Sequence, residues 1–166
     1  MISDNMQSLL NAQYHRELHS ALQYFAMSSW FLQEDLDGFA NFFRVQAEEE
    51  MEHAMKQFDY IHEVDGKVAH EGIGAVENNF KDLKAVFEAA LAQERDVTKH
   101  IHEIVRAALD ESDFATHNFF QWFVQEQVEE EATMRTIIAK LKLIDGNTSA
   151  LYLMNEELNQ RQPEAE

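Results

Sequence analysis

The sequence predicts an all-α protein, a bundle of four long helices with one long crossover and a short fifth helix near the C-terminal end. Its 166 residues include five Gly and a single Pro, Pro163, so nothing interrupts helices until almost the end of the chain. Apolar residues also recur at helical spacing over long stretches. With 45% hydrophobic residues the chain can bury a substantial core, and we expect one domain over residues 1–166.

The apolar spacing predicts the helices in order. The long ones are expected at about 5–35, 38–65, 81–110 and 114–143, and the short one at about 149–160. Gly38 marks the first break, the acidic stretch from Asp110 to Asp113 the third, and Gly146 the last. Because the first and third joints are tight, the first and second helices are expected to pair antiparallel, as are the third and fourth.

The second joint is long. From Gly66 to about Phe80 there is no sustained helical stripe. At up to ~3.5 Å per residue such a segment can run the ~40 Å length of a helix of this size. We therefore expect a crossover along the bundle, in place of the short loop that a simple up-and-down bundle has.

Charge and cysteine content exclude several kinds of partner and metal site. The formal net charge is -18, which argues against nucleic acid or an anionic membrane as a partner and favours the attraction of cations. Cysteine is absent, so disulfides, thiolate zinc sites and iron–sulfur clusters are excluded, and any metal must be held by O and N ligands. The first residues resemble no signal peptide, and no apolar run approaches membrane-spanning length, so we expect a cytoplasmic protein.

The core-facing stripe of each long helix is interrupted by polar residues near its middle. Followed in steps of three and four, each stripe is otherwise mostly aromatic, aliphatic or small. Since the middles of antiparallel helices meet at one height, the interrupting residues are predicted to converge in one layer. They are Glu17 on the first helix, Glu50 and His53 on the second, Glu94 on the third, and Gln127 and Glu130 on the fourth.

Four ionised carboxylates in an apolar core repel one another and lose hydration worth several kcal/mol each. Two cations bridged by shared carboxylates cancel that charge, whereas partial protonation relieves only part of it. Oxygen ligands with one imidazole suit iron or manganese and admit zinc as a competitor. Iron is the predicted metal.

The motifs together resemble those of bacterial non-haem ferritins, members of the ferritin-like di-iron superfamily. The resemblance rests on Glu17 with Tyr24, the run Glu48–His53, Glu94, and the run Gln125–Glu131, and it covers nearly the whole chain. It implies a ferritin-like four-helix bundle that assembles into a homo-oligomer of 24 subunits. It also implies that one iron is held by Glu17, Glu50 and His53, and the other by Glu50, Glu94 and Glu130, with Gln127 close to the first iron or to dioxygen.

Two further assignments follow from the resemblance and have plain alternatives. Tyr24 is the tyrosine that ferritins place beside the centre, but a core aromatic with a satisfied hydroxyl fits its position equally well. A third iron position would use Glu130 together with Glu49, Glu126 and Glu129, whereas an ordinary solvated acidic face explains these last three as well.

The fourth helix lacks the second histidine of the generic di-iron bundle, which separates the chain from bacterioferritin, so no haem is expected. The expected function is iron storage with ferroxidase activity, the oxidation of Fe(II) by dioxygen at a di-iron centre within each subunit. The catalytic set would be Tyr24 together with the six residues of the polar layer. The alternative is a soluble di-metal peroxidase or catalase-like enzyme that stores nothing.

Overall fold

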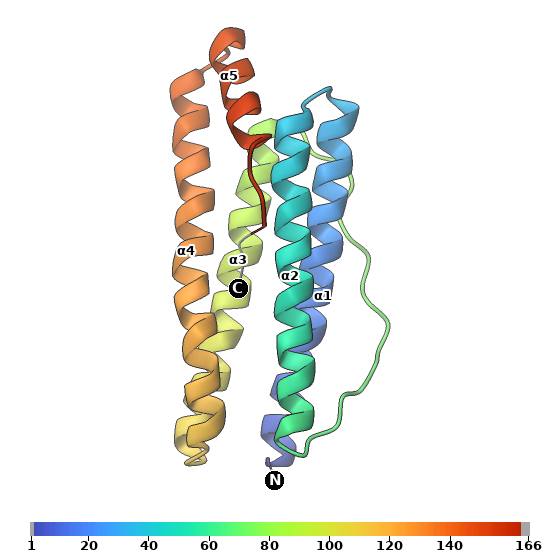
Figure 1. The fold of residues 1–166 in the computed structure, drawn as a ribbon, viewed down its shortest axis with the longest axis vertical. Coiled ribbons are helices and arrows are strands. Elements are labelled where there is room, and N and C mark those ends of the chain that lie inside the picture. Colours follow the sequence, from blue (N-terminus) through green and yellow to red (C-terminus); the bar gives the residue numbers. More distant parts are fainter. Residues whose placement is uncertain (1, 164–166) are drawn as a thin grey trace.

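The computed structural model describes residues 2–163 and contains helices but no strand over that range. Four helices form the bundle, α1 (Asp4–Gln33), α2 (Asp37–Glu63), α3 (Leu83–Asp110) and α4 (Phe114–Ile144), and α5 (Thr148–Leu158) lies across one end (Figure 1). The all-α fold and the short fifth helix are confirmed, and every helix end lies within two residues of its predicted position. In the described range no helix is long and apolar enough to cross a membrane.

The joints between the helices contain non-glycine residues with positive φ, and after α4 the predicted Gly146 also has a positive φ, of 77°. Positive φ is adopted by Asp35 before α2, Asp65 after α2, Ser112 before α4 and Asp145 after α4. The prediction that Gly38 marks the first break was wrong, because Gly38 lies inside α2. Aspartate, with its short polar side chain, can adopt the left-handed conformation, so the first turn does not require a glycine at Asp35.

Gly38 has a different structural role, in the contact between α2 and α5. A Cβ at this position would lie 1.7 Å from the backbone oxygen of Asn155 in α5. That close approach lets Asn155 Oδ1 accept the N–H groups of Gly38 (2.9 Å) and Phe39 (3.3 Å). The first turn of α2, whose own N-cap Leu36 offers no side-chain acceptor, is therefore capped by α5.

The apolar side of α5 packs against its own subunit. Met154 is buried, and Leu151 and Leu158 pack against the core at this end of the bundle. The hydrophobic side chains that remain exposed near here are Leu143, Tyr152 and Leu153.

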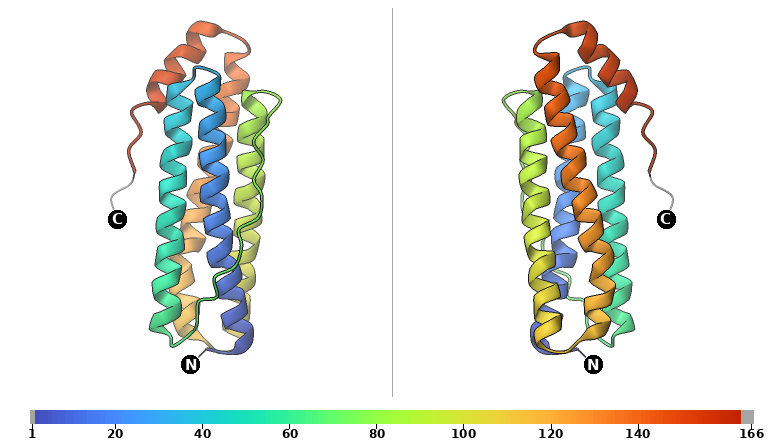
Figure 2. Two further views of the ribbon diagram at one scale, coloured as in Figure 1. Left: turned by 90° about the vertical axis from the view of Figure 1, so that its right-hand side faces the viewer. Right: turned by 90° about the vertical axis from the view of Figure 1, so that its left-hand side faces the viewer.

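The crossover, residues 64–82, has no helix and runs along the bundle as predicted (Figures 1 and 2). It is held by polar side chains of α1 that recur every fourth residue and so share one face. Asn11, for example, donates to Lys67 O (2.9 Å) and accepts from Ala69 N (2.7 Å). The other members of this row are Gln7, His15, His19 and Gln23.

The buried apolar residues form two separate clusters. One lies toward the α5 end and includes Phe31, Phe39, Phe43, Phe87 and Met134. The other lies toward the opposite end and includes Met6, Leu10, Val97, Ile101 and Phe120. Along α3, Ala90 belongs to the first cluster and Val97 to the second, with Glu94 between them. A polar layer therefore divides the core at mid-bundle.

The predicted stripes, followed in steps of three and four from Leu10, Phe39, Leu83 and Thr116, are buried almost throughout. The two exceptions, Leu83 at the start of α3 and Leu141 near the end of α4, are partly exposed because they lie at the ends of the bundle. The helical spacing therefore identified the inward face of each long helix correctly.

Candidate metal centre

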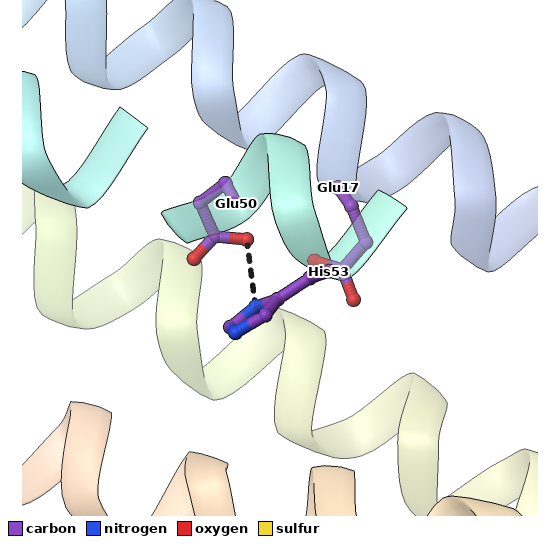
Figure 3. Close-up of side chains that lie close together, drawn as sticks. All are labelled: Glu17, Glu50 and His53. Carbon is purple, nitrogen blue, oxygen red and sulfur yellow. Dashed lines mark ion pairs between the residues drawn. The ribbon is translucent and has the colours of Figure 1, made fainter. Parts of the chain in front are cut away.

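Glu17, Glu50 and His53 form a compact cluster within the polar layer. One ligand atom from each lies within 4.8 Å of the others. Glu17 projects from α1, while Glu50 and His53 project from one face of α2 (Figure 3). The Nδ1 atom of His53 lies 3.6 Å from Glu50 Oε2. All three side chains are buried, so any charge they carry is shielded from water.

The ring of His53 is fixed by aromatic side chains of α4. Trp122 and Phe123 contact it edge-on, at centroid distances of 5.3 and 5.9 Å. Trp122, one position before Phe123 on α4, is partly buried. The surface it packs against is the imidazole of the cluster.

Glu94 faces this cluster from α3 and is completely buried. Its Oε1 accepts a hydrogen bond from the hydroxyl of Tyr24, and its Oε2 accepts one from Gln127 Nε2 at 3.0 Å. Gln127 also donates to the backbone oxygen of Glu94, at 3.1 Å. Burial raises the pKa of Glu94 to about 7, although the hydrogen bonds from Tyr24 and Gln127 act in the opposite direction.

Glu130 completes the set from α4. Gln46 Nε2 donates to Glu130 Oε2 at 2.8 Å. Burial raises the pKa of Glu130 to about 8, and the charge on Glu94 adds to that effect. Burial also raises the pKa of Glu50 well above its usual range, and the charges of Glu94 and Glu17 raise it further. These three carboxyls are thus close enough to disfavour one another's ionisation.

The pKa of the Tyr24 hydroxyl is raised well above its usual value, by burial first and then by the charges of Glu94 and Glu50. Tyr24 is therefore a protonated donor directed at Glu94. It is also a core aromatic, since its ring lies 5.7 Å from that of Phe43. Tyr24 therefore both packs in the core and donates to Glu94, so the two interpretations that the sequence left open are compatible.

Two carboxylate oxygens in this layer lack a hydrogen-bond donor among the described residues and are free to bind a cation. Glu17 Oε2 and Glu50 Oε2 are buried and have no hydrogen-bond partner among the described residues. Glu17 Oε1, by contrast, accepts from both Gln13 Nε2 and Gln57 Nε2, each at 2.9 Å. A buried carboxylate with one oxygen fixed and the other unsatisfied is suited to a metal ion, because leaving it unpaired is costly.

The glutamines that hold these carboxylates were not predicted from the sequence. Gln46 lies four residues before Glu50, Gln57 four residues after His53, and Gln13 four residues before Glu17. The usable signal was the spacing, since residues four apart on a helix face the same way. A glutamine one turn from an inward carboxylate could therefore have been predicted to donate a hydrogen bond to it.

Glu49, Glu126 and Glu129 line a pocket of about 400 Å³ between α2 and α4. Glu49 is buried, Glu126 is partly exposed and Glu129 is exposed. Glu130 and His53 also line this pocket, so it adjoins the buried cluster. The other lining residues are Glu52, Lys56, Trp122, Thr133 and Arg161. The three glutamates thus meet at one pocket, on a surface that solvent can reach.

The model of the family described as "Ferritin-like domain" matches residues 7–144. The chain belongs to the ferritin family. A bacterial non-heme ferritin of Campylobacter jejuni is 40% identical over 156 residues, covering 94% of this chain and 93% of that protein. The predicted resemblance to this family is confirmed.

Solved ferritin structures agree with the fold. The open-pore ferritin of the hyperthermophilic archaeon Archaeoglobus fulgidus is 44% identical, with a TM-score of 0.96 over 98% of this ferritin and 100% of that chain. A closed form of the same archaeal ferritin, engineered by site-directed mutagenesis, is 43% identical, with a TM-score of 0.97 over 99% of this ferritin and 100% of that chain. The ferritin-like topology is therefore shown.

The raised pKa values predict how the stability of the metal-free ferritin depends on pH. Between about pH 4.5 and 8 the folded state binds more protons than the unfolded state, at Glu94 and Glu130. Stability is therefore lost as the pH rises through about 7 and 8. We expect the melting temperature of chelator-treated protein to fall by about 5 °C or more from pH 6 to pH 9. Added Zn²⁺ should reduce this fall, and a melting temperature that rises over the range would contradict the account.

Proposed function

We propose that this ferritin oxidises Fe(II) with dioxygen at a two-iron centre within each subunit and stores the ferric product inside an oligomeric shell. The observation that carries the proposal is the buried cluster of Glu17, Glu50 and His53, with two carboxylate oxygens left unsatisfied in an otherwise apolar core. Membership of the ferritin family and the similarity to a bacterial non-heme ferritin support iron as the metal.

In this proposal one Fe(II) binds Glu17, Glu50 and His53, and the second binds Glu50, Glu94 and Glu130. Glu50 is the bridging ligand, which agrees with its position between the charges of Glu17 and Glu94. The bound metal supplies the electrons for the reduction of dioxygen. Anionic oxygen ligands contribute by favouring the ferric state of the product.

The supporting side chains orient the ligands. Gln13 and Gln57 hold Glu17 Oε1, so Glu17 Oε2 is the atom offered to the first iron. Tyr24 and Gln127 each donate to one oxygen of Glu94, which fixes the plane of that carboxylate. Gln46 does the same for one oxygen of Glu130. Ligands held in advance lower the reorganisation required when Fe(II) arrives.

The pocket between α2 and α4 is the proposed third iron position. Glu49, Glu126 and Glu129 line it, and Glu130 belongs both to this pocket and to the buried layer. Iron leaving the centre by this side would meet carboxylates throughout, which matches the hard oxygen ligands that ferric ions prefer.

Storage requires assembly, and we propose a homo-oligomer of 24 subunits. The support is the near-complete match to ferritins, one of them described as an open-pore ferritin and another as its engineered closed form. The exposed hydrophobic residues Leu143, Tyr152 and Leu153 near α5 provide apolar surface for contacts between subunits.

The function is tested by mass and by stoichiometry together. The native mass should be about 24 times the subunit mass, and metal-free protein given Fe(II) and air should show a rapid oxidation phase that saturates near two irons per subunit. Further iron should then enter more slowly as mineral. A small oligomer with rapid oxidation and no retained iron would instead favour the peroxidase or catalase-like alternative.

A further inference from the structure

The pocket between α2 and α4 contains a positive charge that comes from outside the bundle. Five of its lining residues are glutamates, namely Glu49, Glu52, Glu126, Glu129 and Glu130. Arg161, which follows α5, also lines it. Arg161 lies beyond the last helix, so helical spacing in the sequence could not predict this contact.

Three kinds of contact place Arg161 at the pocket. Asn41 Nδ2 donates to the backbone oxygens of Leu158 (3.2 Å) and Arg161 (3.1 Å), which directs the segment after α5 along α2. The guanidinium lies over the ring of Phe42, 4.5 Å from its centroid. Its Nη2 atom donates to Glu49 Oε2 at 2.7 Å. Figure 1 shows this segment descending from α5 on the side where α2 and α4 face the viewer.

The pair between Arg161 and Glu49 is shielded more than a surface ion pair. The side chains are 23% and 10% exposed, respectively, so solvent screens their attraction incompletely. The guanidinium is nevertheless not fully satisfied, because its Nη1 atom is buried without a hydrogen-bond partner in the described part of the chain. Moving the guanidinium out of the pocket would let water satisfy this N–H group, which offsets part of the attraction to Glu49 that is lost.

We infer that Arg161 is a tethered cation that competes with metal ions for Glu49 and thereby lowers the cation affinity of the pocket. A metal ion bound at Glu49 must either displace the guanidinium or remain close to its charge. Because Glu130 and His53 line the same pocket, the competition acts next to the buried cluster. The inference concerns the third iron position and rests on the proposed function for its role in iron handling. The competition itself requires only that the pocket binds a cation.

Terbium(III) is a suitable probe, since it prefers oxygen ligands and its luminescence is sensitised by a nearby tryptophan. Trp122 lines the pocket, and the only other tryptophan, Trp30, packs against Phe31 and Phe80 elsewhere. Titrating the iron-free native assembly should give a luminescence component that disappears in Glu49→Gln. Arg161→Gln should lower the dissociation constant of that component about three- to tenfold, and Arg161→Lys should change it less.

Two controls make the result specific. Arg135→Gln removes an equal charge from another arginine–glutamate pair, that of Arg135 with Glu131 on α4, and should leave the constant unchanged. In Glu49→Gln, the further change Arg161→Gln should have no effect on residual binding, as a double-mutant cycle requires. An unchanged dissociation constant in Arg161→Gln, an equal effect of Arg135→Gln, or no component sensitive to Glu49→Gln would each overturn the inference.

The outcome is separable from that of the proposed function. Terbium binding is measured without iron or oxidation, whereas the proposed function is tested by the rapid oxidation phase. If the wild-type protein lacked that phase, the ferroxidase proposal would fail while the terbium shift still supported the competition. A normal oxidation phase with no terbium shift would leave the ferroxidase proposal intact and reject the role of Arg161.

Discussion

Replacing Glu17 with Ala is expected to lower the initial rate of Fe(II) oxidation by about a hundredfold or more, and His53→Ala is expected to do the same. Each change removes a ligand of the proposed first iron from a cluster whose ligand atoms lie within 4.8 Å of one another. With one ligand lost, the two metals are no longer both held at bridging distance, and the paired oxidation of two Fe(II) ions fails.

Stopped-flow absorbance after mixing with Fe(II) in air provides the measurement. Glu48→Ala is the matched control, because Glu48 is an exposed carboxylate on α2 two residues from Glu50. It should retain the wild-type initial rate. Native mass and helical content must be unchanged in each variant, since Glu17→Ala also leaves the amides of Gln13 and Gln57 without their acceptor. Wild-type rates in correctly assembled Glu17→Ala and His53→Ala would reject the assignment of the centre.

Glu130→Gln is expected to stabilise the metal-free protein at high pH while weakening metal binding. At pH 9 the wild-type carboxyl, whose pKa is raised to about 8, must ionise in a buried site. A neutral glutamine avoids that ionisation, so unfolding should require more free energy, on the order of 5 kcal/mol. At pH 6 the folded carboxyl is mostly protonated while that of the unfolded chain is ionised, so the variant should gain less, about 2 kcal/mol.

Chemical unfolding of chelator-treated protein at the two pH values measures this difference. In the same variant, the stabilisation given by saturating Zn²⁺ should be smaller than in the wild type, since one charged ligand is lost. Glu48→Gln is the matched control, an exposed carboxylate on α2 outside the pocket and the buried layer, and should show neither effect of comparable size. Equal behaviour of the two variants at pH 9 would mean that Glu130 carries no special burial cost.

The polar layer was predictable from sequence because two periodicities coincide. Helical spacing fixed the inward face of each helix, and the position of Glu17, Glu50, Glu94 and Glu130 near mid-helix fixed their common height. The chemistry of the cluster then followed from charge, since buried carboxylates require compensation. Its geometry places each of these carboxylates in the core, as expected.

Other features depend on contacts between segments that sequence spacing does not relate. Asn155 caps α2 across 117 residues of chain, and Arg161 reaches Glu49 across 112 residues. The requirement for glycine at position 38 likewise comes from the close approach of α5, while the chain reverses earlier, at Asp35. Spacing along one helix predicts which way a side chain faces, but it does not predict which distant backbone will meet it.

The most direct test of the central claim is a crystal structure of the protein soaked with Fe(II) without oxygen, with anomalous scattering used to locate iron. The account predicts two iron sites within each subunit, one bound by Glu17, Glu50 and His53 and the other by Glu50, Glu94 and Glu130. It would be contradicted by iron bound only at surface carboxylates, with these buried side chains making no contact to metal.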